Sequence, residues 1–228
     1  MIIESARLAA SELLRPRFRS VLLKSVGLTI LLFIGAWFAL EFAFSTLVAP
    51  FLGAWPWVTT AIAWLLGAGV FIGAGFLLAP VAALFAGLFL DDAAAHVEET
   101  YYPQDAVGKE VPIGRSLWLT IRFTLLVLFA NLIALLLVLL PGINIAIFFL
   151  VNGYFLGREY FMFAAMRFRS EAEAARLRSH YSTYVFLAGL IIAGFMAIPI
   201  VNLATPVFGA ALMVHMHKAL SEDVRFER

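Results

Sequence analysis

Three long stretches of this chain contain no charged residue and no histidine, and polar stretches lie before, between and after them. The uncharged blocks cover residues 42–90, 123–157 and 181–214. A helix that crosses a membrane needs about 20 predominantly apolar residues, and each block is longer than that. The pattern therefore predicts an all-α integral membrane protein whose polar stretches lie outside the hydrocarbon core.

The first apolar region is long enough for two complete membrane crossings. It runs from residue 25 to residue 90 and is interrupted only by Glu41, which we expect near the outer interface. The connecting loop is expected at residues 49–57, where Trp55 and Trp57 suit the level of the lipid headgroups. The second crossing also carries a face of small residues that suits helix packing or subunit contact: Gly67, Gly69, Gly73 and Gly75.

The other two blocks are too short to cross the membrane twice. Two crossings and a turn need roughly 44 residues, and the segments 123–157 and 181–217 are shorter than that. Each is broken near its middle by proline, at Pro141 and at Pro199. They are predicted to be two re-entrant, hemi-penetrating helical hairpins. The alternative is that each is one long, kinked crossing, which would place the arginines of 158–178 outside.

The distribution of lysine and arginine favours the hairpins. Every Lys and Arg lies in one of four polar stretches, and basic residues beside membrane segments mark the cytoplasmic side. We therefore expect a single membrane domain over residues 1–228, with both termini cytoplasmic. Its order would be an amphipathic interfacial helix at 1–19, two transmembrane helices at 20–90, a cytoplasmic segment at 91–122, a hairpin at 123–157, a cytoplasmic helix at 158–180, a hairpin at 181–217 and a cytoplasmic tail at 218–228.

The amphipathic helix at the N-terminus is predicted from the spacing of its apolar residues. These recur on one helical face, and Glu4, Arg7 and Glu12 lie on the other. This arrangement is typical of a helix that lies in the membrane surface with its apolar side in the lipid.

Composition excludes several classes of protein. The chain is 63% hydrophobic and 14% charged, whereas a soluble domain carries roughly 25% charged residues. A net charge of +1 gives no basic field for nucleic acid. Because cysteine is absent, there is no disulfide framework, thiol nucleophile or thiolate metal site. The sequence also shows no nucleophile–base pair and no cluster of metal ligands, so we expect neither an enzyme nor a bound metal or other cofactor.

The segment Arg17-Phe18-Arg19-Ser20 is the leading candidate for a ligand site. Pro16 should break the interfacial helix, and Ser20 is expected to cap the long helix that follows. Unpaired backbone N–H groups, the positive end of a helix dipole and the guanidiniums would then converge, which is how proteins bind sulfate, phosphate or carboxylate. The alternative is a basic anchor that touches lipid headgroups.

Four further residues are candidates for lining a pore. Asn144 and Asn202 each follow a proline at the centre of an uncharged block, and such Pro-broken repeats point to a substrate path. Arg158 and Glu159 end the second block abruptly, and ionisable residues at membrane depth often line a path. The alternatives are two kinked helices that pack together and an interfacial ion pair.

The order of the motifs along the chain resembles a known family. The motifs are Leu78-Ala79-Pro80, Leu140-Pro141-Gly142-Ile143-Asn144, Arg158-Glu159-Tyr160, and Ile198-Pro199 followed by Asn202, Pro206 and Val207. In this order and spacing they resemble the CysZ-type sulfate permeases of bacteria, which share a fold family with the etoposide-induced membrane proteins of eukaryotes.

The resemblance implies two long transmembrane helices, two hemi-penetrating hairpins and a homo-oligomer that passes sulfate or sulfite inward for cysteine biosynthesis. It also implies a sulfate site at a Gly-Leu-Arg-Arg-like motif that opens the first long helix. Only Arg19 matches that motif cleanly, because Arg17 replaces the glycine and Ser20 replaces the second arginine.

Two functions from different classes follow. The first is a sulfate channel or permease that mediates uptake across the bacterial inner membrane, in contact with lipid and with other copies of itself. The second is a non-conducting membrane scaffold or partner-binding protein that its basic segments anchor to the membrane.

Overall fold

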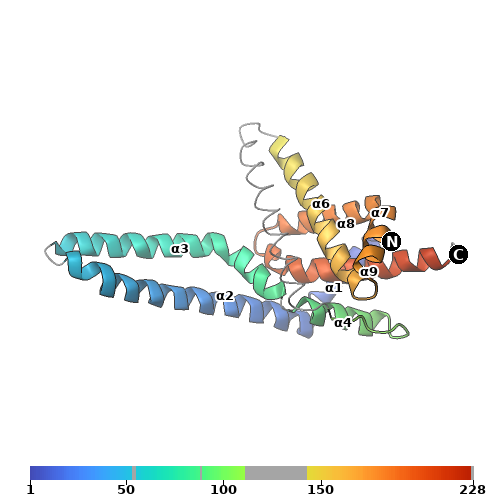
Figure 1. Cartoon of the computed structure of the whole chain (residues 1–228), viewed down its shortest axis with the longest axis horizontal. Coiled ribbons are helices and arrows are strands. Elements are labelled where there is room, and N and C mark those ends of the chain that lie inside the picture. The colour runs from blue at the N-terminus through green and yellow to red at the C-terminus, as the bar shows by residue number, and fades with distance from the viewer. Residues whose placement is uncertain (53–54, 88, 111–142, 227–228) are drawn as a thin grey trace.

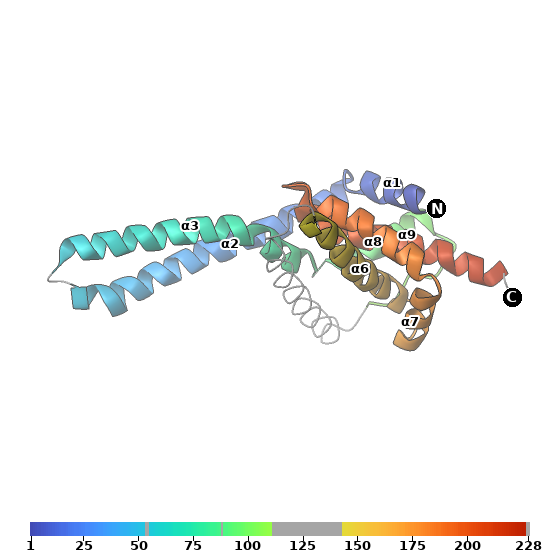
Figure 2. The same ribbon diagram turned by 90° about the horizontal axis from the view of Figure 1, so that it is seen from above.

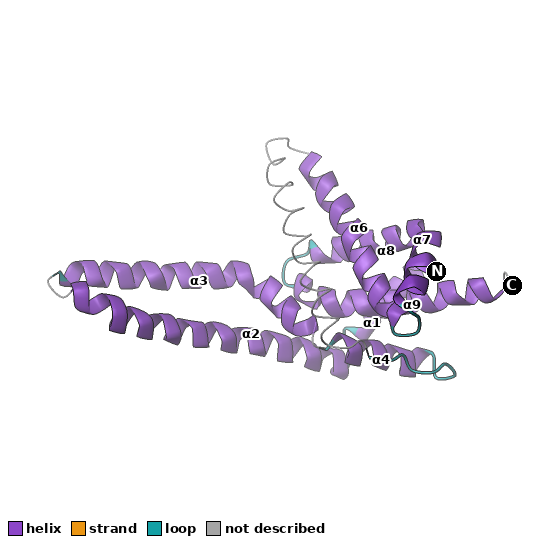
Figure 3. Cartoon of the chain, in the orientation of Figure 1, coloured by secondary structure: helices purple, strands orange, loops and turns teal. Residues whose placement is uncertain are grey.

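The computed structural model describes residues 1–52, 55–87, 89–110 and 143–226, with the side chains of 75–80, 82–87, 143–144 and 223–226 excepted. All regular structure in these ranges is helical, as Figure 3 shows. The α-helices are α1 (Ile2–Glu12), α2 (Pro16–Ala43), α3 (Pro56–Gly87), α4 (Leu90–Tyr101), α6 (Ile143–Met166), α7 (Glu171–His180), α8 (Ser182–Met196) and α9 (Thr205–Phe226).

Helices α2 and α3 lie side by side and form an arm that projects from the remaining helices (Figures 1 and 2). Helix α2 begins at Pro16, whose fixed φ suits the first helical position. It continues through the π-helical turn Phe44–Val48 into the 3₁₀ turn Ala49–Leu52. Two segments of the arm, Pro16–Leu52 and Pro56–Ala74, are long and apolar enough to cross a membrane. The prediction of two candidate spanning helices is therefore confirmed.

The surface of the arm suits a lipid environment. Many of its large side chains are exposed, and Trp64 and Phe71 are 77% and 81% exposed. The few buried hydroxyls are satisfied within the helix, since Ser25 donates to the carbonyl of Val21 at 2.9 Å and Thr29 to that of Ser25 at 2.8 Å. In hydrocarbon every backbone and side-chain polar group needs such an internal partner, and the arm meets that requirement at these positions.

Helix α9 is the centre of the remaining body. Residues 205–218 of α9 are all buried, and α1, α4, α6 and α8 pack around this helix. A helix that is surrounded in this way needs apolar residues on all sides, and the run from Val207 to Val214 supplies them. The body therefore holds the main core of the described chain, and the arm extends from it.

Helices α6 and α8 cross with their backbones in contact. A methyl group on Gly189 of α8 would lie 1.9 Å from the carbonyl oxygen of Gly153 and 2.8 Å from the Cα of Gly157, both on α6. Small residues at a crossing permit this close approach. The glycines of the arm behave differently, because Gly67 lies against the ring of Trp37 whereas Gly69 and Gly73 face open space.

Helices α8 and α9 are joined by an irregular turn at the place where the sequence predicts a break. The turn contains Pro199 and the 3₁₀ helix η4 (Val201–Ala204), which contacts the base of the arm. Ile200 has φ of 68°, and the amide of Val201 donates to the carbonyl of Pro199 at 2.8 Å. These features define a γ-turn with positive φ, which is strained for a β-branched residue.

Other predicted segments differ from the structure in their limits. Helix α6 continues without a break through Arg158 to Met166, so the helix expected at 158–180 is the end of α6 followed by the separate helix α7. The tail expected from residue 218 is a continuation of α9 to Phe226. The first arm of the hairpin at 123–157, up to Gly142, lies outside the described residues.

The N-terminal helix packs against protein, and its expected polar face is not wholly exposed. Helix α1 contacts α8 and α9, and Ala9 is fully buried. Glu12, which helical periodicity places on the polar face, is also fully buried. That part of the prediction is wrong because Glu12 has partners on other elements, described next.

Candidate functional site

The candidate anion-binding motif occupies the first two turns of α2. Pro16 is the first helical residue and Arg15 is the N-cap, in extended conformation and without a side-chain capping bond. Ser20 therefore lies inside the helix, and the prediction that it caps α2 is wrong. The helix starts earlier than expected because proline favours the first helical turn.

Arg15 is fixed to the body by a buried carboxylate. Its Nε lies 2.7 Å from Oε1 of Glu12, and the hydroxyl of Tyr101 in α4 donates to the same oxygen at 2.7 Å. Nη2 of Arg15 in turn donates to the Tyr101 hydroxyl at 3.2 Å. The Glu12 side chain is fully buried, so it cannot turn away towards water. This closed triangle joins α1, α2 and α4 at the base of the arm.

Arg17 faces α4 and makes looser contacts. Its Nη1 lies 3.5 Å from Nδ1 of His96 and 3.9 Å from Oε2 of Glu99. A guanidinium only donates, so Nδ1 of His96 is the acceptor in any hydrogen bond between them. The second ring nitrogen of His96 is Nε2. That nitrogen faces Oε2 of the buried Glu12 at 3.6 Å. The side chains of Arg17 and Glu99 are each about half exposed, at 54% and 53%.

Arg19 points away from this network. It is exposed, and no described residue pairs with its guanidinium. Residues two apart on a helix face different ways, so Arg17 and Arg19 do not converge on one point through their side chains. Their shared feature is the helix end, where the N–H groups of Arg17 and Phe18 have no carbonyl partner within α2. The amide of Arg19 is the first to bond back, to Arg15 at 3.0 Å.

Phe18 and Ser20 contribute less than the arginines to an accessible site. The ring of Phe18 is buried in the core and lies 5.7 Å from that of His96. Phe18 is 1% exposed as a whole residue, so neither its ring nor its backbone N–H is accessible to a ligand. Ser20 is partly buried in the second turn. The structure thus divides the predicted motif into two cationic side chains, one core side chain and one hydroxyl.

The candidate pore residues lie in different parts of the body. Asn202 is in η4, at the turn between α8 and α9 and against the base of the arm. Arg158 and Glu159 lie in the middle of α6 and are partly buried. Asn144 is in the first turn of α6, and its side chain lies outside the described residues. The structure thus places Asn202 on a different element from Arg158 and Glu159.

A second buried ion network holds α4 against the end of α6. Arg167 donates through Nε to Oε1 of Glu98 at 2.8 Å and through Nη2 to Oε2 at 3.1 Å, and it also pairs with Asp91. The side chains of Arg167 and Glu98 are both 1% exposed. Burial would lower the pKa of Arg167, but hydrogen bonds and charges from Glu98 and Asp91 raise it. Arg167 therefore stays charged and positions the helix that carries His96 and Glu99.

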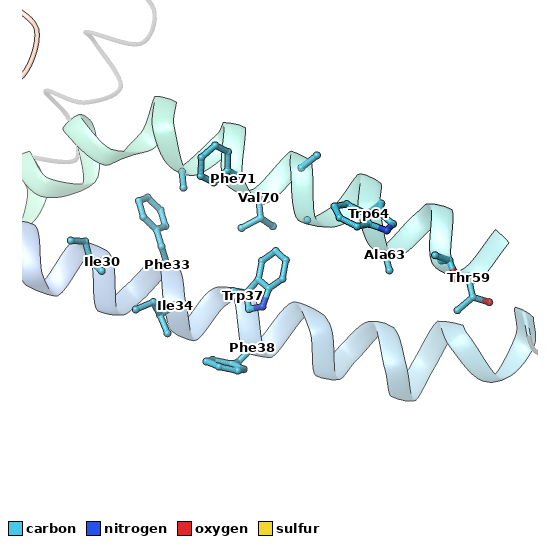
Figure 4. Close-up of a pocket in the computed structure, with 14 residues that line it drawn as sticks. Ile30, Phe33, Ile34, Trp37, Phe38, Thr59, Ala63, Trp64, Val70 and Phe71 are labelled. Atoms are coloured by element: carbon cyan, nitrogen blue, oxygen red, sulfur yellow. The ribbon is translucent and has the colours of Figure 1, made fainter. Parts of the chain in front are cut away.

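A large apolar groove lies in the arm, away from the basic motif. It has a volume of about 1260 Å³ and is lined by apolar and aromatic side chains of α2 and α3, including Phe33, Trp37, Trp64 and Phe71 (Figure 4). Its hydroxyl groups are already engaged, since Thr60 donates to the carbonyl of Pro56 at 3.0 Å. Without charged groups, the groove is unsuited to a sulfate ion.

The acidic and imidazole partners of the arginines were not predicted from the sequence. Glu12 and Tyr101 are 89 positions apart, and no local pattern predicts such a contact. A partial signal was present, because His96 and Glu99 are three residues apart and therefore share a face of α4. The site is consequently more nearly charge-balanced than a cluster of arginines alone would be.

A comparison with protein families identifies the chain. The family described as sulfate transporter CysZ/etoposide-induced protein 2.4 matches residues 6–206. No curated protein matches the chain. The matched region begins within α1 and extends to the start of α9, so it contains the arm, the basic motif and the turn at Pro199. With two helices suited to cross a membrane and a match over most of its length, this membrane protein belongs to the sulfate transporter CysZ/etoposide-induced protein 2.4 family.

Proposed function

We propose that this protein is a non-enzymatic sulfate channel or permease that admits the dianion across the bacterial inner membrane for cysteine biosynthesis. The observation that carries this is the start of α2, where Arg19 is exposed without a partner among the described residues and the N–H of Arg17 has no helical acceptor. Guanidiniums and N–H groups at a positive helix end are suited to tetrahedral oxyanions. The family match supports sulfate as the substrate.

The site is suited to transient binding. An ion that must leave again needs weak contacts at several positions along its path. Arg19 is exposed, and Arg17 is shared with α4, so neither arginine encloses a ligand. In this proposal the arginines raise the local sulfate concentration at the cytoplasmic face, and Asn144, Arg158, Glu159 and Asn202 line the path beyond.

The proposed arrangement in the membrane follows from the same elements. The arm crosses the bilayer with lipid chains in its groove, whereas segments 123–157 and 181–217 enter as hairpins and return. Helix α1 lies at the membrane surface, and both termini are cytoplasmic. Copies of the chain would associate so that their hairpins together complete the path, because irregular backbone at membrane depth must be covered by protein or water.

The experiment is uptake of labelled sulfate into liposomes that contain the purified protein. Arg19→Ala removes charge-assisted hydrogen bonds, each worth about 1.5–3 kcal/mol, so we expect uptake at low sulfate to fall about tenfold or more. Arg19→Lys should restore only part of it, since an ammonium lacks the forked donors of a guanidinium. Arg7→Ala, on the exposed side of α1, is the matched control and should keep wild-type uptake.

The second candidate, a non-conducting scaffold anchored by its basic segments, predicts a different pattern. A lipid anchor depends on charge and not on the geometry of the donors, so Arg19→Lys would behave like wild type. Uptake no greater than that of empty liposomes, with the protein folded and inserted, would contradict the transport proposal and favour the scaffold.

A further inference from the structure

The three arginines at the start of α2 differ in how firmly an acid holds them. Arg15 is bound to Glu12, which is fully buried and also bonded to Tyr101. Arg19 has no described partner. Arg17 is intermediate, because its acid, Glu99, is 3.9 Å away and 53% exposed. Of the two acids paired with these arginines, Glu99 is thus the one that can swing into solvent without leaving a buried charge unpaired.

We infer that Glu99 is an affinity-setting residue that competes with the transported oxyanion for Arg17. The inference rests on the proposed function, since it takes sulfate as the ligand. A separation of 3.9 Å exceeds the 2.7–2.9 Å of a charge-assisted hydrogen bond. Exposed pairs of this kind contribute little, about 0.2–1 kcal/mol. A dianion that accepts a forked bond from Arg17 can therefore displace the carboxylate.

The neighbouring groups of α4 hold the competitor in place. His96 cannot follow Arg17 outward, because its ring lies against Phe18 and its Nε2 faces Glu12. The helix itself is anchored by the bond between Arg167 and Glu98, the residue that precedes Glu99. The carboxylate thus stays within reach of Arg17 and returns when the anion leaves. Such a competitor keeps binding weak enough for release, which conduction requires.

The test is the dissociation constant for sulfate of Glu99→Gln, measured by titration calorimetry on full-length protein in detergent at fixed ionic strength. Removal of a competitor worth about 0.2–1 kcal/mol should lower the dissociation constant about 1.4- to 5-fold. Glu4→Gln is the matched control, because Glu4 pairs with Arg7 on the exposed side of α1. It removes the same charge from an exposed ion pair that does not involve α2, and it should leave the constant unchanged.

The Arg17→Gln background separates competition from general electrostatics. If Glu99 acts through Arg17, Glu99→Gln has no further effect once Arg17 is replaced, and the double-mutant cycle shows coupling. A gain in sulfate affinity from Glu99→Gln that persists in the Arg17→Gln background would overturn the inference. No gain in affinity from Glu99→Gln alone, although the wild-type protein binds sulfate, would overturn it as well. Both results would leave the proposed function standing. Absence of sulfate binding in both wild type and Glu99→Gln would overturn the proposed function, and the inference with it.

Discussion

At the scale of single residues, burial decides which charges are structural and which are available to a ligand. Arg15 and Arg167 are engaged with the fully buried carboxylates of Glu12 and Glu98. Arg17 and Arg19 are both exposed, on different faces of α2, and have a loose partner and no described partner, respectively. A count of arginines would treat these four alike, although only two are placed to meet an anion.

The pair Arg167–Glu98 yields a stability prediction. Arg167→Met leaves the Glu98 carboxylate buried without its cation, and breaking a buried pair in this way costs about 3–5 kcal/mol. The double variant Arg167→Met/Glu98→Leu removes both charges and should recover much of that loss. Unfolding in detergent measures both variants. Arg19→Met is a control that should unfold as wild type does, and equal losses in the single and double variants would contradict this account.

Long-range pairs mark the limit of prediction at this scale. The basic motif was found from residue type alone, because Arg, Pro and Arg in one short run are visible in the sequence. The burial of Glu12 was not, because its position on α1 follows from helical periodicity whereas its partner Tyr101 lies on α4. Periodicity gives the face of a helix, but it does not say which other element covers that face.

At the scale of elements, the crossing of α6 and α8 gives a sharp prediction. Gly189→Ala would drive a methyl group into the backbone of Gly153 and Gly157. The helices must then separate, and overpacking of this kind costs about 1–3 kcal/mol. Thermal unfolding in detergent measures the effect. Gly194→Ala on the same helix is the control, since nothing lies within 4 Å of its added methyl group, and a Gly189→Ala protein as stable as that control would contradict the crossing.

The turn between α8 and α9 gives a second prediction at this scale. Ile200 adopts φ of 68° and is 82% exposed, so its side chain gains little from burial. Strain at such a position is of the order of 1–3 kcal/mol, and glycine relieves it at an entropic cost of about 0.5–1 kcal/mol. We therefore expect Ile200→Gly to unfold at a higher temperature than wild type. A lower unfolding temperature would show that the isoleucine makes stabilising contacts.

The helices could be predicted from the sequence where the length of an apolar run or the position of a proline determines them. The two long apolar runs became α2 and α3, and the break at Pro199 separates α8 from α9. The ends of helices were harder to predict. At Arg158 the appearance of charge suggested the end of a helix. Helix α6 continues through that point, and its residues beyond the apolar run are still buried at Phe161, Ala164 and Ala165.

At the scale of the whole molecule, the arm and the body differ in how they suit a membrane. The segment Pro16–Leu52 has 37 residues, which is roughly 55 Å as a helix, against about 30 Å of hydrocarbon. The arm is long enough to pass both headgroup layers. The body has a buried centre in α9 and ion networks on its α4 side, which suits a position partly in the membrane and partly at its surface.

The absence of cysteine makes this topology directly testable. We expect Phe51→Cys, at the exposed tip of the arm, to react with a membrane-impermeant maleimide added from outside the cell. Ser11→Cys and Ser179→Cys, on α1 and α7, should react only after the cytoplasmic side is opened. Labelling of Ser179→Cys from outside would support the single kinked crossing in place of the hairpins.

The central claim is that the protein itself conducts sulfate, and current across a planar bilayer tests it most directly. With a tenfold sulfate gradient and an impermeant cation, a passive pathway for a divalent ion predicts a reversal potential of about 30 mV in magnitude. The current should fall in Arg19→Ala and persist in Arg7→Ala. No current above that of the bare bilayer, with protein shown to be inserted and folded, would contradict the account.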